Sequence, residues 1–241
     1  MAAPEPPARP PSPRGAGEGE AGATARVFGR RIGRPLRPGQ KQALGALLPW
    51  LRFRPEEPGF LSGEVVLEIG FGSGEHFAGL LRTHSGARLI GAEVFLNGLA
   101  ALLARLVREE AEVPFRDRTR LWPDDARALL ARLPDGCLDR VFLLFPDPWP
   151  KSRHAGRRMV QPAFLGDLAR VLKPHGAVTV ATDHPGYRDW IAAVLAEATA
   201  LRVVAREDRR PADPPRTRYE AKAFREGRHT TWWQLARPEA R

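Results

Sequence analysis

The sequence contains a single cysteine, Cys137, among its 241 residues. An intrachain disulfide is therefore excluded, which fits a reducing compartment such as the cytoplasm. No apolar run approaches the roughly 20 residues that a membrane-spanning helix needs, and the N-terminus lacks the apolar core of a secretory signal. We therefore expect a cytoplasmic protein that does not engage a membrane.

Acidic residues are scarce relative to basic ones. The chain has 28 Asp and Glu against 38 Lys and Arg, which gives a formal net charge of +10. Such a charge favours an anionic partner, either nucleic acid or a membrane surface. Nearly all the basic residues are arginine, and alanine and proline are abundant, which is typical of a genome-wide compositional bias. The position of the charges therefore matters more than their total.

The chain divides into three parts by composition. Residues 1–25 are mostly proline, alanine and glycine and have little to bury, so we predict a disordered tail. Residues 26–41 hold six basic residues and no acid. This segment is either a solvated basic linker or an arm that faces RNA, and charge alone does not separate the two. Residues 42–237 have the length and composition of one domain.

Within this domain, short apolar runs alternate with amphipathic stretches. Strands are expected at 64–69, 88–93, 119–122, 138–145, 173–183, 201–205 and 229–235. Helices are expected at 42–53 (with a break at Pro49), 75–84, 95–110, 124–133, 161–172 and 186–198. The alternation predicts an α/β fold with a doubly wound, mostly parallel sheet. The last two strands have no clear helix between them, which indicates a hairpin-like end with one antiparallel strand.

Glycines follow the first expected strand. Gly70, Gly72 and Gly74 let the backbone pass close beneath a ligand, and the next helix points its N-terminus at the same place. A dinucleotide fingerprint requires a glycine at the sixth position counted from Gly70, where this chain has Glu75. A nicotinamide-dependent reductase is therefore disfavoured.

Acids stand at the ends of the first three strands. The run E-x-G-x-G-x-G, which starts at Glu68, resembles the first motif of class I S-adenosylmethionine (SAM) methyltransferases. SAM carries an ammonium and a sulfonium, so a carboxylate beside it is favourable. Glu93 has the spacing of a carboxylate that holds ribose hydroxyls. In methyltransferases an acid in the turn at Asp124 and Asp125 meets the adenine amino group, although Asp124 also suits a helix N-cap.

The fourth expected strand runs into FPDPWPKSRHAGRR, residues 145–158. Flanking prolines restrict the backbone around Asp147 and hold its carboxylate in one place. Trp149 offers a flat face for an unstacked base. Four cations follow that suit phosphates, namely Lys151, Arg153, Arg157 and Arg158. A loop with a solvated charge run is the alternative, and the adjoining SAM-type motif disfavours it.

This stretch, extended to FPDPWPKSRHAGRRMVQ, resembles the signature of the bacterial tRNA (guanine-N7)-methyltransferases. Segments 28–40, 180–190 and 217–228 resemble the family's N-terminal basic segment, its T-D segment and its late T-[KR]-[FY]-E motif. The likeness extends over about residues 28–235; Ser152 and Ala155 stand where relatives are often charged or polar. It implies a class I SAM-methyltransferase (Rossmann-like) fold, the cofactor S-adenosyl-L-methionine, and methylation of N7 of the variable-loop guanine of tRNA.

The resemblance also implies residue roles. The cofactor site would be lined by Glu68, Gly70, Gly72, Gly74, Glu93, Asp125 and Asp147, with Asp147 also catalytic. The substrate would meet Lys151, Arg153, His154, Arg157, Arg158, Asp183, Thr217, Arg218, Tyr219 and Glu220. Two simpler interpretations remain open: Asp183 suits a turn, and Thr217 with Glu220 has capping-box spacing. No metal is expected, and the chain is either a monomer or a homodimer.

A mechanism follows from the target atom. Guanine N7 carries a lone pair and no proton, so its attack on the methyl group needs no general base. The methylated ring is cationic, and we expect Asp147 to orient the guanine and stabilise the developing charge. The alternatives are a SAM methyltransferase with another substrate and a non-catalytic RNA-binding protein on this scaffold.

Overall fold

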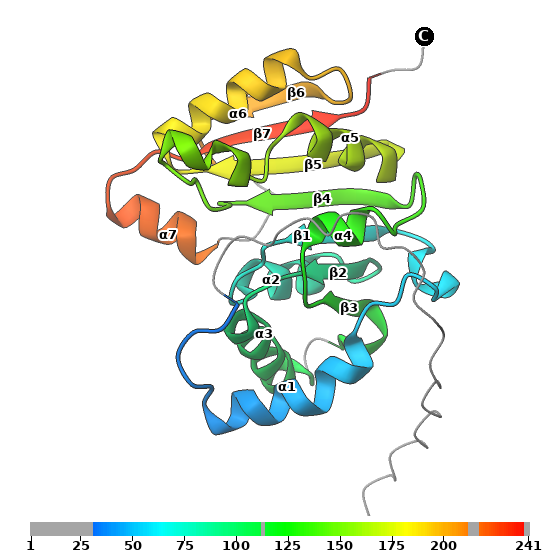
Figure 1. The fold of residues 1–241 in the computed structure, drawn as a ribbon. Helices are drawn as coiled ribbons and strands as arrows, with labels where there is room; N and C mark the ends of the chain where they lie inside the picture. The colour runs from blue at the N-terminus through cyan, green and yellow to red at the C-terminus, as the bar shows by residue number, and fades with distance from the viewer. Residues whose placement is uncertain (1–30, 112–113, 212–216, 239–241) are drawn as a thin grey trace, which may run out of the picture.

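The structure is a computed structural model, and it describes residues 31–111, 114–211 and 217–238. The predicted tail at 1–25 and the first five residues of the predicted arm, 26–30, lie outside the described residues. Within the described ranges the strands form one seven-stranded sheet, ordered β3-β2-β1-β4-β5-β7-β6 (Figure 1). The strands are β1 (Val65–Ile69), β2 (Arg88–Ala92), β3 (Thr119–Trp122), β4 (Leu138–Leu144), β5 (Leu172–Thr182), β6 (Arg202–Glu207) and β7 (Thr231–Ala236).

Strands β1 to β5 are parallel, and β7 is antiparallel to both of its neighbours, β5 and β6. The predicted fold class, a mostly parallel α/β sheet with a final antiparallel strand, is confirmed. The chain order reverses between β1 and β4, which lie side by side. Ligands bind at the carboxyl ends of the strands at such a reversal.

Helices cover both faces of the sheet (Figure 1). Helices α4 (Ala126–Leu130), α5 (Pro162–Val171) and α6 (Pro185–Glu197) pack on one face. Helices α1 (Pro38–Leu51), α2 (Glu75–Thr83) and α3 (Leu96–Glu109) pack on the other. Because it is covered on both faces, β1 is buried along its whole length, as its continuous apolar run predicts. Among the described residues, no helix is long and apolar enough to cross a membrane.

The first helix differs from the expectation in two ways. Helix α1 begins at Pro38, because proline fits the first helical position, where its missing N–H costs nothing. The predicted break at Pro49 is wrong: the helix continues through it to Leu51. Burial of Ala43, Leu47 and Leu51 in the core shared with α3 outweighs the hydrogen bond that proline removes.

The C-terminal part of the chain also differs from the expectation. Strands β6 and β7 pair antiparallel, as a hairpin-like end requires, but helix α7 (Arg218–Arg225) lies between them in sequence. Helix α4 is shorter than the expected 124–133. Three short 3₁₀ helices complete the elements, η1 (Pro58–Leu61), η2 (Arg116–Arg118) and η3 (Ser152–Arg157).

Candidate active site

A cavity of about 370 Å³ opens where the parallel strands end, which is large enough for a small-molecule ligand. Its walls come from the loops after β1, β2, β3 and β4 together with the first turn of α7. Among the predicted site residues, the structure brings the following to its lining: Gly70, Gly72, Glu93, Asp125, Asp147, Arg157, Arg218 and Tyr219. Residues far apart in the sequence thus meet around one hollow.

The glycine loop forms the floor of this cavity. All three of its glycines have positive φ, a conformation in which other residues are strained. A Cβ on Gly70 would meet nothing within 4 Å, so this backbone is open to a ligand. A Cβ on Gly74 would instead approach Leu102 of α3 to 2.5 Å. Gly70 and Gly72 therefore border the cavity, while Gly74 is needed for helix packing and lies outside its lining.

The carboxylate of Glu93 is fixed by the backbone on both sides. It accepts hydrogen bonds from the N–H of Gly72 at 2.7 Å and of Phe95 at 2.9 Å. Burial raises the pKa of Glu93, the backbone hydrogen bonds oppose this, and the charge of Asp147 adds to the rise. A carboxylate has about four acceptor positions, so Glu93 can accept further hydrogen bonds beyond those of the backbone. Two acceptors at a cavity wall suit a pair of ribose hydroxyls.

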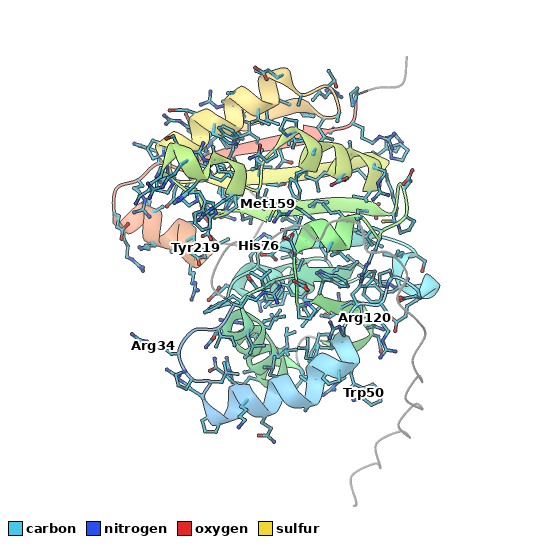
Figure 2. The ribbon with its side chains drawn as sticks, viewed as in Figure 1. Arg34, Trp50, His76, Arg120, Met159 and Tyr219 are labelled. Carbon is cyan, nitrogen blue, oxygen red and sulfur yellow. The ribbon has the colours of Figure 1, made fainter. Side chains whose placement is uncertain are left out.

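Glu68 is buried behind the glycine loop and does not line the cavity. Its Oε2 lies 3.0 Å from Nδ1 of His76 in the first turn of α2, and both side chains are almost fully buried. His76 lies in the interior of the molecule (Figure 2). The structure therefore pairs Glu68 with an imidazole, and its expected contact with a cofactor remains a prediction.

The turn after β3 corrects the assignment of the N-cap. The N-cap of α4 is Asp125, whose Oδ1 accepts the N–H of Arg127 at 2.8 Å, because this side chain reaches the second residue of the helix. The Arg127 guanidinium also pairs with Asp125 at 2.7 Å. Asp124 is not the N-cap; its Oδ1 accepts the Asp125 N–H and lies 2.5 Å from Nη2 of Arg31. Both acids line the cavity.

The loop after β4 presents Asp147 at the cavity rim. Phe145 and Trp149 flank it with φ of 54° and 42°, a left-handed conformation that costs non-glycine residues about 1–3 kcal/mol each. The Phe145 N–H donates to the Ala181 carbonyl at 2.8 Å, which holds the start of the loop. Asp147 is exposed and has no hydrogen-bond partner among the described residues. The strained backbone and the unpaired carboxylate of Asp147 thus lie in the same loop.

Arg158 clamps this loop from behind. Its guanidinium donates to the carbonyls of Pro148 at 3.1 Å and Trp149 at 3.2 Å. The same guanidinium lies 4.7 Å from the ring centre of Trp190 in α6. The sequence predicts that Arg158 meets the RNA backbone; in the structure its Nε and Nη2 donate to the loop, and a contact with RNA remains a prediction. The guanidinium of Arg157 covers the ring of Trp149 at 5.1 Å.

The remaining cations of the run lie outside the cavity. Lys151 and Arg153 are exposed on and beside η3. The pKa of His154 is lowered, first by desolvation and then by the charges of Arg157, Arg153 and Lys151. This concentration of positive charge beside the rim is suited to phosphates.

Helix α7 supplies an aromatic side of the rim. Its N-cap is Thr217, whose hydroxyl accepts the Glu220 N–H at 3.0 Å, so capping by Thr217 is confirmed, while the side chain of Glu220 turns to Arg210. Glu220 pairs with Arg210 at 3.2 Å. Arg218 and Tyr219 line the cavity, and the Tyr219 ring stacks on Phe145 with centroids 6.5 Å apart. Figure 2 shows Tyr219 on α7, at the side of the molecule where β4 ends.

Asp183 is not brought to this cavity. It accepts two hydrogen bonds from the Arg228 guanidinium, at 3.0 and 2.7 Å, in a separate hollow of about 260 Å³. Its predicted contact with substrate remains a prediction. No group of three or more metal-ligating side chains occurs in residues 31–111, 114–211 and 217–238.

Sequence reasoning missed several residues that line the cavity, namely Phe95, Arg127, Phe145 and Met159. Phe145 had a usable signal, since it directly precedes Pro-Asp-Pro-Trp. Phe95 follows Glu93 by two positions, where the chain leaves the sheet. Met159 carried no signal, because nothing in its local sequence indicates that the chain returns to the cavity there.

Comparisons with known proteins show the family to which the chain belongs. The model of a family described as "Putative methyltransferase" matches residues 62–232. Among curated relatives, the tRNA (guanine-N(7)-)-methyltransferase of Granulibacter bethesdensis is 47% identical, over 88% of this chain and 95% of its own length. The protein of the same name from Rhodospirillum rubrum is 44% identical, over 85% of this chain and 84% of its own.

Solved structures agree on the fold alone. An antibiotic-related methyltransferase aligns with a TM-score of 0.59 at 14% identity, over 77% of this chain and 95% of its own. A 16S rRNA methyltransferase aligns with a TM-score of 0.56 at 17% identity, over 78% and 95%. With relatives this similar over most of its length, the chain belongs to the bacterial tRNA (guanine-N7)-methyltransferase family.

Proposed function

We propose that this protein transfers the methyl group of S-adenosyl-L-methionine to N7 of the variable-loop guanine of tRNA. One observation carries the proposal: an exposed carboxylate, Asp147, stands in a strained loop at the rim of a cavity whose floor is an open glycine loop. The names of the relatives, which are tRNA (guanine-N(7)-)-methyltransferases, support the substrate. A tRNA substrate in turn implies a cytoplasmic location.

The residues present fit SAM. Gly70 leaves the space above its Cα open, and the doubly held carboxylate of Glu93 presents acceptors for the ribose hydroxyls. Asp124 and Asp125 lie at the far wall, where the adenine amino group would be received. Arg127 engages both oxygens of Asp125, whereas Arg31 and the Asp125 N–H engage only Oδ1 of Asp124, so Oδ2 of Asp124 has no partner among the described residues. When bound, the cofactor would supply an electrophilic methyl group on a sulfonium; its S–CH3 bond breaks as the bond to N7 forms, and neutral S-adenosylhomocysteine leaves.

Asp147 has the position and freedom that the substrate guanine needs. It borders the cavity, is exposed, and affects the charge balance of Glu93 across the hollow. Its carboxylate can accept from the guanine N1–H and amino group, which aims the N7 lone pair into the cavity. As N7 forms its new bond to carbon, the purine ring gains a positive charge that this carboxylate stabilises. No proton has to move to Asp147 at any stage.

The rim groups suit a base held outside its helical stack. Tyr219 and Phe145 form one aromatic side of the rim, and Trp149 with Arg157 forms the other. Stacking on such surfaces is the usual way in which proteins hold an extruded base. Lys151 and Arg153 beside them would receive the flanking phosphates. Positioning by these groups supplies much of the rate.

The test uses purified protein, isotopically labelled SAM and two tRNA transcripts. One transcript carries guanine at the core position of the variable loop and the other carries adenine there. We expect label on the guanine transcript alone, and one chemical cleavage site for N7-methylguanine in that loop. Equal label on both transcripts would contradict the proposed target. Binding of the cofactor without labelling of either RNA would favour a different substrate or a non-catalytic role.

A further inference from the structure

The basic segment before α1 is fastened to the cavity wall by one side chain. The Asn97 amide, in the first turn of α3, accepts the Gly33 N–H at 2.8 Å and donates to the Arg34 carbonyl at 2.6 Å. Beside it, the Leu96 N–H donates to the Arg31 carbonyl at 2.9 Å. Three hydrogen bonds from consecutive residues thus hold residues 31–34, which we call the strap.

The strap lies on residues that also border the cavity. A Cβ on Gly33 would lie 2.9 Å from Cζ of Phe95 and 3.2 Å from Oδ1 of Asn97, so the two segments are in close contact. The side chain of Arg31 reaches Asp124 on the other side of the same wall. Phe95 and Asp124 both line the cavity. The strap therefore has a defined place beside the proposed cofactor and substrate site.

The strap and the residues that follow it carry exposed positive charge. Arg34, Arg37 and Lys41 are all exposed, and none forms an ion pair with a described acid. Arg34 projects away from the body of the domain (Figure 2). Exposed arginines held in a fixed place match the phosphates of an RNA better than the same residues on a free chain, because less conformational entropy is lost on binding.

We propose that Asn97 is a positioning residue for the RNA substrate: it pins the strap to the cavity wall and so holds Arg34, and the basic residues that follow it up to Lys41, where tRNA binds. The inference rests on the proposed tRNA substrate. Asn97 contacts neither the cavity nor any cation directly, and it acts through the backbone of Gly33 and Arg34. Its contribution therefore belongs to substrate affinity and leaves the chemical step alone.

The chain offers a direct probe of docking. Asn97 is the only asparagine of the 241 residues, so selective ¹⁵N-asparagine labelling gives one side-chain amide signal in the NMR spectrum. In the full chain we expect its two amide protons to be shielded from solvent exchange. We expect Gly33→Val, which places a branched side chain against Phe95 and Asn97, to move this signal to the position and exchange rate of a free asparagine.

Kinetics test the role with two variants that act from opposite sides. Asn97→Ala removes the amide from α3, and alanine favours the helix, so the domain keeps its fold. Gly33→Val displaces the strap by crowding Phe95 and Asn97, and it leaves the sequence of α3 unchanged. The matched control is Gln40→Ala. It removes an amide at the start of α1 whose oxygen accepts the Arg37 N–H at 3.1 Å.

We expect the KM for tRNA to rise about 5-fold or more in both test variants, with kcat within about 2-fold. The control should stay within about 2-fold in both constants.

The results separate failure of the proposed role of Asn97 from failure of the proposed function. Wild-type activity on tRNA, with both test variants indistinguishable from Gln40→Ala, would overturn the inference and leave the proposed function intact. A fall in kcat at unchanged KM would also overturn it, since Asn97 would then act on the chemical step. A wild-type chain that methylates no tRNA removes the proposed function, and the role of the strap fails with it.

Discussion

The two walls of the cavity are built in opposite ways. On the wall formed after β1, β2 and β3, the carboxylates of Glu93 and Asp125 already accept backbone N–H groups of the protein itself. On the wall formed after β4, Asp147 is exposed and has no hydrogen-bond partner in the part of the chain that the structure describes, and it lies beside the exposed cations Lys151 and Arg153. The first wall is complete in the protein alone. In the proposed function, the charges on the second wall are paired by the substrate.

We call the wall after β4 the open wall and the wall after β1, β2 and β3 the closed wall. The largest effect is expected at Asp147, on the open wall. Asp147→Asn keeps the shape and removes the charge that stabilises the methylated purine, so the single-turnover rate should fall about 100- to 1,000-fold. The melting temperature should not change, because this side chain holds nothing in the described structure. A rapid-quench assay at saturating tRNA and cofactor measures the rate. Near-normal turnover would show that the open wall does not act on the chemistry.

The next effect is expected at Glu93, on the closed wall. Glu93→Gln removes the charge that the Gly72 and Phe95 N–H groups share, so the affinity for S-adenosylhomocysteine should fall about 10- to 100-fold. Isothermal titration calorimetry measures this, and tRNA affinity in the absence of cofactor serves as the control. If the affinity for tRNA fell by the same factor as the affinity for S-adenosylhomocysteine, the closed wall would not be specific to the cofactor.

The carboxylate of Glu93 should also make cofactor affinity depend on pH. Burial raises the pKa of Glu93, so the group takes up a proton at a higher pH than an ordinary glutamate does. Only the ionised form accepts from both N–H groups, so cofactor affinity should fall as the pH is lowered from neutrality through the range above the titration of an ordinary glutamate. Calorimetry across this range should show the fall in the wild type and a flat profile in Glu93→Gln. A flat wild-type profile would contradict the argument.

A smaller contrast separates two arginines of the open wall. Arg158→Ala loses donors to the Pro148 and Trp149 carbonyls, at about 1–2 kcal/mol, so melting should drop by about 3–6 °C. Arg153→Ala should leave the melting temperature unchanged, weaken tRNA binding a few-fold, and reduce its salt dependence by about one charge. Thermal unfolding and filter binding measure the two. If the two variants changed melting temperature and tRNA affinity alike, the separate roles of Arg158 in holding the loop and of Arg153 in contacting tRNA would be contradicted.

The comparison also explains what the sequence predicted well. Strand β1 is a short β-branched run with glycines after it, and both signals are local. The same holds for Asp147, since Pro-Asp-Pro-Trp lies within a few residues at a strand end. Local patterns set the elements and the order of the loops, and in a parallel sheet the order of the loops already brings the strand ends together.

Other features depended on partners distant in sequence. The pairing of Arg31 with Asp124, and of Asn97 with Gly33, joins segments that no local pattern connects. Arg158 looked like its neighbours in the basic run, and only the backbone of the folded loop shows where its donors go. At Pro49 the local rule predicted a break, and tertiary packing of α1 outweighed it.

Hydrogen–deuterium exchange of the wild-type chain tests the division between the walls most directly. Exchange is measured for the free protein, with S-adenosylhomocysteine, and with tRNA. The account predicts that S-adenosylhomocysteine protects peptides covering residues 70–75 and 92–97. It predicts that tRNA protects peptides covering 147–158 and 217–225, and that neither ligand produces the pattern of the other. Protection of 147–158 by S-adenosylhomocysteine together with no response of this segment to tRNA would contradict the account.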